Sequence, residues 1–106
     1  MIPLPSQEFF ESLIAKNIAH EPMVIVRFTA SWCVPCQRVN TQHLLALSNE
    51  IVWYVCDLDE NDYTPGYAGV RTIPAFLAIR NGVPLPVFQS SDTHKISDWI
   101  RTTFNL

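Results

Sequence analysis

The sequence predicts one domain over residues 1–106, an α/β fold with a central mixed β-sheet flanked by helices on both faces. Three observations support this class. Residues 23–29 form a nearly unbroken apolar run, which is typical of a strand covered on both faces. Strand-like and helix-like segments alternate, as they do where helical crossovers connect parallel strands. The pair Asn81-Gly82 between two strand-like segments indicates a β-hairpin, which adds antiparallel pairing.

The chain begins with a short strand and a helix. Residues 2–4 predict a very short strand, which we expect at a sheet edge because Pro3 and Pro5 cannot donate to a strand ladder. Ser6 is a suitable N-cap for a helix over about 7–18, where apolar residues recur at spacings of three and four.

The apolar run 23–29 predicts a central parallel strand, which hands over through a tight turn to a helix over about 34–49. Pro35 falls in the first turn of this helix, where its missing N–H is not needed. Residues 51–56 are rich in β-branched and aromatic side chains and predict the next strand, which the acidic segment 57–62 closes.

The second half of the chain predicts a short helix or turn within 60–70, a strand over 75–80 and, after the hairpin, a returning strand over about 83–89. The prolines of the returning strand place it at an edge of the sheet. Asp92 is a suitable N-cap for a last amphipathic helix, whose apolar side chains turn inward.

Composition excludes several classes of function. The chain is 48% hydrophobic with a formal net charge of −3, and its basic residues are scattered singly, so we expect no nucleic-acid partner. No apolar run reaches the roughly 18 residues of a membrane span. The N-terminus also lacks the basic start and apolar stretch of a secretory signal. We therefore expect a cytoplasmic protein without a membrane partner.

Three cysteines are too few, and odd in number, for a disulfide-stapled scaffold, so they indicate chemistry. Cys33 and Cys36 are separated by two residues, where the predicted strand hands over to a helix. The free N–H groups and the dipole of a helix N-terminus stabilise a thiolate at Cys33, which becomes a nucleophile at neutral pH. Cys36 lies within one helical turn of it and can resolve a mixed disulfide.

The chain resembles the thioredoxin family from about Ile2 to its end. The features that carry the resemblance occur in order: the strand 24–29, the segment Ala-Ser-Trp-Cys-Val-Pro-Cys at 30–36, Asp-Leu-Asp-Glu-Asn at 57–61, Thr-Ile-Pro at 72–74, and Asn81-Gly82. The resemblance implies a thioredoxin fold and an enzyme that reduces protein disulfides, with Cys33 attacking and Cys36 resolving. It also implies no cofactor beyond the redox-active Cys33–Cys36 disulfide, no metal, and protein disulfides and a thioredoxin reductase as partners.

The resemblance further implies a docking rim around the cysteine pair. In the family, the proline that matches Pro74 is cis and faces the disulfide, and the residue before it, here Ile73, pairs through its backbone with an extended substrate segment. The rim of substrate-binding residues consists of Trp32, Val34, Pro35, Ile73 and Pro74. The family's usual glycines are replaced by Val34 and by about Ser90, which puts the usual set of partners in doubt.

One departure concerns the site itself. The family's buried Asp, which accepts a proton from the second cysteine, is Arg27 here, and its Lys neighbour is Val55. Because a guanidinium stays protonated, Arg27 cannot act as a base. We expect a modulating ion pair of Arg27 with Asp57 beneath Cys36, which favours the thiolate and a more oxidising couple. The alternative is that Arg27 extends to solvent.

Other interpretations stay open. Cys33 and Cys36 could be a zinc half-site, although the chain offers no second cysteine pair. Cys56 could be a buried small hydrophobe or a redox partner. The acidic segment 57–62 could be a solvated loop, or Asp59, which matches a family Asp, could bond the Trp32 indole. At the level of function, the alternatives are a more oxidising exchange factor and a non-catalytic binding or assembly module with the same fold.

Overall fold

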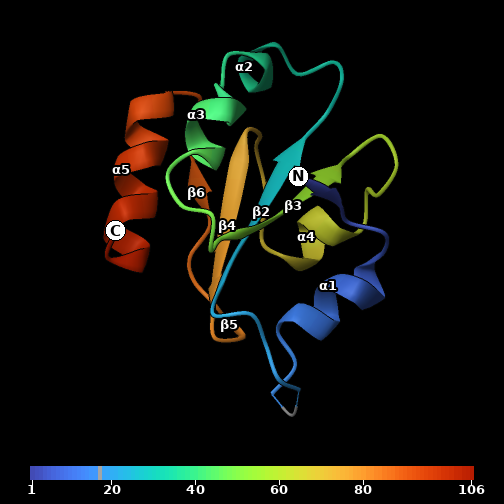
Figure 1. Cartoon of the computed structure of the whole chain (residues 1–106). Coiled ribbons are helices and arrows are strands. Elements are labelled where there is room, and N and C mark those ends of the chain that lie inside the picture. The colour runs from blue at the N-terminus through green and yellow to red at the C-terminus, as the bar shows by residue number, and fades with distance from the viewer. Residues whose placement is uncertain (17) are drawn as a thin grey trace.

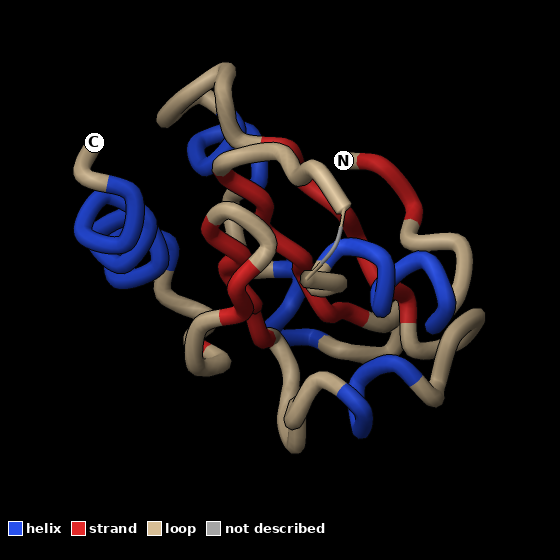
Figure 2. Tube along the Cα trace, turned by 90° about the horizontal axis from the view of Figure 1, so that it is seen from below, coloured by secondary structure: helices blue, strands red, loops and turns tan. Residues whose placement is uncertain are grey.

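The computed structural model describes residues 1–16 and 18–106, and it confirms a mixed β-sheet between two layers of helices. The strands lie side by side in the order β1-β3-β2-β4-β5, and β6 also pairs with β4. Figure 1 shows this sheet edge-on, with α3 and α5 on one side of it and α1 and α4 on the other. Figure 2 shows the same arrangement from below, with strands enclosed between helices.

Parallel and antiparallel pairing meet at the central strand. β1 (Ile2–Pro3) and β2 (Met23–Thr29) both pair in parallel with β3 (Val52–Asp57). On its other side β2 pairs antiparallel with β4 (Ala75–Arg80), so β2 is central as predicted but has only one parallel neighbour. β5 (Val83–Pro84) and β6 (Phe88–Gln89) complete the sheet as antiparallel partners of β4.

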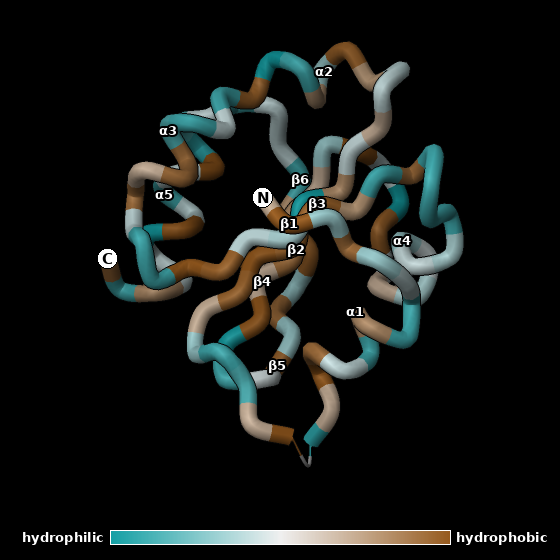
Figure 3. Tube along the Cα trace, turned by 45° about the vertical axis from the view of Figure 1, so that its right-hand side comes forward, coloured by the Kyte–Doolittle hydropathy of each residue, from teal (hydrophilic) through white to brown (hydrophobic). Residues whose placement is uncertain are grey.

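The two faces of the sheet hold separate apolar cores. One core packs β2, β3 and β4 against α1 (Gln7–Leu13) and the segment around α4 (Thr64–Tyr67). The other packs the opposite faces of the same strands against α3 (Thr41–Leu45) and α5 (Thr93–Phe104). Figure 3 shows hydrophobic residues concentrated along these strands. This alternation follows from the two-residue period of a strand, and it explains why the apolar run of β2 is unbroken.

Several predicted elements are shorter than expected. The helix predicted over 7–18 ends at Leu13. Just after the helix, His20 Nε2 donates to the carbonyl oxygen of Ala15. Residue 17 lies outside the described residues. The returning strand predicted over 83–89 is divided into β5 and β6, because its prolines cannot donate to the ladder.

The helix predicted over 34–49 was wrong as a single element. It consists of α2 (Val34–Gln37) and α3, with a break between them. The side chain of Asn40 accepts a hydrogen bond from the N–H of His43 at 3.0 Å and caps a new helix, while its own N–H donates to Thr93 Oγ1. Within the described part of the chain, no helix is long and apolar enough to cross a membrane.

Candidate active site

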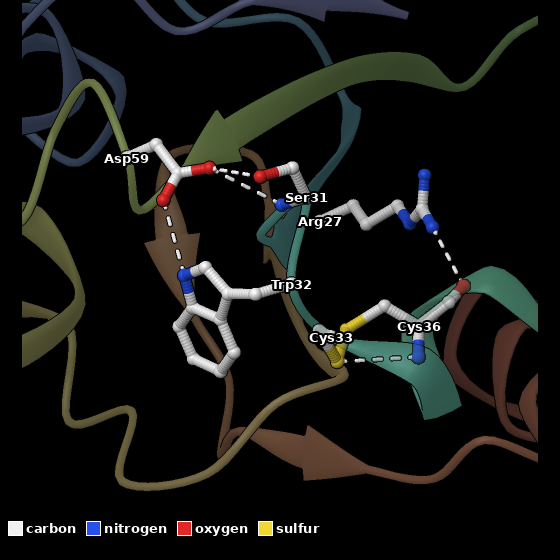
Figure 4. The surroundings of a disulfide bond; sticks show 6 residues. All are labelled: Arg27, Ser31, Trp32, Cys33, Cys36 and Asp59. Carbon is white, nitrogen blue, oxygen red and sulfur yellow. Dashed lines mark hydrogen bonds between the residues drawn. A yellow bond between two sulfur atoms is a disulfide. The ribbon is translucent and has the colours of Figure 1, made fainter.

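Cys33 and Cys36 lie beyond the carboxyl end of the central strand β2. The chain leaves β2 at Thr29, turns with a hydrogen bond from Cys33 N–H to the carbonyl oxygen of Ala30, and enters α2. The two cysteines form a disulfide with their Cα atoms 5.3 Å apart. The structure therefore shows the pair in its oxidised state, at the end of the sheet where α2 lies (Figures 1 and 4).

The two sulfur atoms have different surroundings. Cys33 is the N-cap of α2 and is 4% exposed, whereas Cys36 is fully buried. The N–H of Cys36 donates to Cys33 Sγ at 3.2 Å. A backbone donor at this distance stabilises negative charge that develops on Cys33 Sγ during exchange. Cys33 is thus the sulfur that is both closer to solvent and better able to carry charge.

Asp59 fixes the turn before the cysteine pair. Its carboxylate accepts from the hydroxyl of Ser31 at 2.7 Å, from the N–H of Ser31 at 3.2 Å and from Trp32 Nε1 at 3.0 Å (Figure 4). The bonds from Ser31 are the main reason that the pKa of Asp59 lies below its ordinary value, and the bond from Trp32 acts in the same direction. The predicted hydrogen bond between Asp59 and the Trp32 indole is therefore present.

Ser31 is a site residue that the sequence analysis missed. It supplies two of the donors that hold Asp59, one from its backbone and one from its side chain. The available signal was its position directly before Trp32, since serine commonly bonds to nearby acceptors in turns.

Most of the expected rim residues lie next to the disulfide, whereas Pro74 is buried. Trp32 and Val34 are 65% and 62% exposed, and Pro35 beside them is exposed. Ile73 packs against the cysteines, and the bond between Ile73 and Pro74 is cis. A pocket next to this rim is lined by a mostly apolar set of residues: Trp32, Leu58, Pro65, Val70, Arg71, Thr72 and Ile73. The surface next to Cys33 is therefore apolar and open.

The expected ion pair between Arg27 and Asp57 was wrong. Arg27 Nη2 donates to the carbonyl oxygen of Cys36 at 3.1 Å, and both residues lie in the described part of the chain, where they form no ion pair. Asp57 is in register with Thr29, beyond Arg27, and its Oδ1 accepts the N–H of Asp59. Burial lowers the pKa of Arg27. Arg27 is half-buried, and its head group is bonded beneath Cys36 (Figure 4).

The third cysteine, Cys56, lies in the apolar core on the α1 side of the sheet, in a cluster separate from the disulfide. Cys56 is free and fully buried in the core shared with α1, and its Sγ donates to the carbonyl oxygen of Asn61 at 3.6 Å. Burial, assisted by the negative charge of Asp57, raises the pKa of the Cys56 thiol to about 11. A buried thiol with so high a pKa is a poor nucleophile, which supports the interpretation of Cys56 as a small hydrophobe.

Metal ligands are not gathered anywhere in the described residues. Over 1–16 and 18–106 there is no group of three or more His, Cys, Asp or Glu side chains that could hold an ion. Cys33 and Cys36 are joined to each other, which leaves neither of them as a thiolate ligand in this state.

A disulfide at the end of a central strand, with one cysteine capping a helix and the other fully buried, defines an α/β protein with a redox-capable Cys-x-x-Cys pair. The family model described as thioredoxin matches residues 2–102, and the chain belongs to the thioredoxin family.

Individual relatives agree with this assignment. The chain is 33% identical over 69 residues to thioredoxin from Geodia cydonium, covering 63% of this chain and 65% of that one. It is 33% identical over 84 residues to the chloroplastic M-type thioredoxin of Brassica napus, covering 76% of this chain and 46% of that protein. The chain thus spans less than two thirds of these relatives. The crystal structure of Fasciola hepatica thioredoxin superposes with a TM-score of 0.81 at 25% identity, covering 96% and 98% of the two chains.

Proposed function

We propose that this chain, acting as a single domain over 1–106, reduces disulfide bonds of proteins through Cys33 and Cys36. A thiolate on Cys33 attacks one sulfur of the substrate disulfide, and the other substrate sulfur leaves as a thiolate and takes up a proton. Cys36 then loses its proton and attacks Cys33 Sγ, which re-forms the Cys33–Cys36 disulfide and releases the second substrate thiol. Two electrons pass from the chain to the substrate.

The observation that carries this proposal is the difference between the two cysteines. The N–H of Cys36 is 3.2 Å from Cys33 Sγ, and the Cys36 side chain is covered. The attacking role therefore falls to Cys33, and Cys36 reacts only with the sulfur next to it. No cofactor is required, because the disulfide itself is the redox group.

Trp32, Val34, Pro35, Ile73 and Pro74 form the docking rim for the substrate protein. The exposed apolar surfaces of Trp32, Val34 and Pro35 suit an extended segment on either side of the target disulfide. Ile73 is half-buried and Pro74 is buried, so they would contribute mainly through their backbone, and the Asp59 bond holds the Trp32 indole in place. A thioredoxin reductase is the proposed source of electrons for the next cycle. The cytoplasmic location stays a prediction from the sequence.

The test is reduction of insulin disulfides with dithiothreitol as the electron source. Cys33→Ser should abolish turnover. Cys36→Ser should accumulate a mixed disulfide between Cys33 and the substrate, visible by mass spectrometry, because the resolving thiol is missing. Cys56→Ala is the matched control and should keep turnover, since Cys56 lies in the other core. Full turnover by the Cys33→Ser, Cys36→Ser double variant would refute the proposal and favour a binding module.

A further inference from the structure

Arg27 carries a positive charge beneath Cys36, and within residues 1–16 and 18–106 it forms no ion pair with a carboxylate. Its Nη2 donates to the carbonyl oxygen of Cys36, and its Nε is buried without an acceptor among the described residues. Its register neighbours on β3 and β4 are the apolar residues Val55 and Phe76. The nearest carboxylate on the same face of β3, Asp57, is engaged by the N–H of Asp59 instead.

A half-buried guanidinium in this setting is costly, because it has lost water without gaining a counter-charge. In the disulfide state, the guanidinium of Arg27 is bonded only to the carbonyl oxygen of Cys36 among the described residues. Since the carbonyl oxygen and Sγ belong to the same residue, the guanidinium lies within about 8 Å of the Cys36 sulfur. Cys33 Sγ is the atom bonded to that sulfur, and reduction can place a negative charge on it. Because the guanidinium is half-buried, water weakens its attraction for this charge only in part.

We propose that Arg27 is a positioning residue that raises the reduction potential of the Cys33–Cys36 couple by stabilising the thiolate that reduction forms in this pair. The inference rests on the disulfide exchange proposed above. In the balanced step, two glutathione thiolates supply two electrons and become glutathione disulfide, and the Cys33–Cys36 bond breaks. Both cysteine sulfurs leave this exchange as thiolates; Cys36 takes up a proton from the solvent, and Cys33 keeps its negative charge, which Arg27 and the N–H of Cys36 stabilise.

The first experiment measures the equilibrium of the couple against glutathione buffers. Arg27→Met should shift the equilibrium about tenfold toward the disulfide, which lowers the potential by about 30 mV for two electrons. Arg27→Lys keeps the charge and should stay within about twofold of the parent. Arg80→Met removes an equal charge from an exposed position at the opposite end of β4 and should leave the equilibrium unchanged.

The second experiment compares urea unfolding of the oxidised and reduced forms. Because the unfolded couple does not sense Arg27, the change in potential must equal a change in relative stability of the two folded forms. In Arg27→Met, the oxidised form should gain stability relative to the reduced form by the amount that matches the tenfold shift. Arg27→Gln, which also removes the charge, serves for both experiments if Arg27→Met does not fold.

The outcomes separate the two proposals. If the parent couple is reversible and the reduction potential of Arg27→Met equals that of the parent, the role of Arg27 is overturned and the exchange reaction stays intact. A charge-removing variant whose oxidised and reduced forms differ in stability by the same amount as the parent's overturns the role of Arg27 as well. A parent without any reversible two-electron couple overturns both the role of Arg27 and the proposed function.

Discussion

Replacing Trp32 with alanine should weaken the reduction of protein disulfides far more than the reduction of small ones. The indole is 65% exposed beside Cys33, so about 160 Å² of a side chain of about 250 Å² is open to a docked protein. A substrate that covers half of this area buries about 80 Å², which is worth about 2 kcal/mol at 25 cal/mol per Å². The value of kcat/KM for a protein substrate should therefore fall about 30-fold.

The assay compares insulin with glutathione disulfide as substrates of the same variant. A small disulfide contacts little of the indole, so its kcat/KM should change by less than about threefold. Val83→Ala is the control, because Val83 is 60% exposed on β5, at the end of the sheet opposite α2 (Figure 1). Equal losses for insulin and glutathione disulfide in Trp32→Ala would refute docking by Trp32 and indicate a defect at the sulfur atoms.

Two further predictions concern groups with shifted pKa values. Asp59 has a lowered pKa in the folded chain, so its contribution to stability is present above its ordinary pKa of 3.8 and is lost as the pH falls through the lower folded value. Because the Trp32 indole bonds to this carboxylate, its fluorescence should change over the same pH range. Asp59→Asn should remove both the loss of stability and the change in fluorescence. Cys56 has a pKa raised from 9.0 to about 11, so the unfolded chain loses its thiol proton first and stability should fall as the pH rises from 9 to 11. Unfolding of the reduced Cys56→Ala variant should lack this alkaline decline, and a decline of equal size in that variant would contradict the assignment.

The sheet could be predicted from the sequence because its signals are local. The bounds 23–29 and 75–80 were predicted without error, since a strand buried on both faces appears as a continuous apolar run. The Asn81-Gly82 turn was equally clear: both residues have positive φ, at 50° and 79°, as a two-residue hairpin requires. Such features depend on few residues, all of them close in sequence.

The break between α2 and α3 could not be predicted from the same kind of signal. Apolar residues continue at helical spacing across the break, and Asn40 becomes a cap because Thr93, far away in the chain, accepts its N–H. A contact over this separation leaves no periodic trace in the local sequence. The ion pair assigned to Arg27 failed for a similar reason. Strand alternation correctly placed Arg27 and Asp57 on one face, but a nearer acceptor on Cys36 took the guanidinium.

The break also changes the origin of the reactivity at the cysteine pair. The sequence analysis attributed a stabilised thiolate to the dipole of a long helix over 34–49, yet α2 has only 4 residues and a correspondingly small dipole. Two local groups take over this task. The N–H of Cys36 donates directly to Cys33 Sγ, and the guanidinium of Arg27 donates to the carbonyl oxygen of Cys36. Because both act through Cys36, changes at α3 or α5 should alter stability without altering the potential, whereas changes at Arg27 should alter the potential.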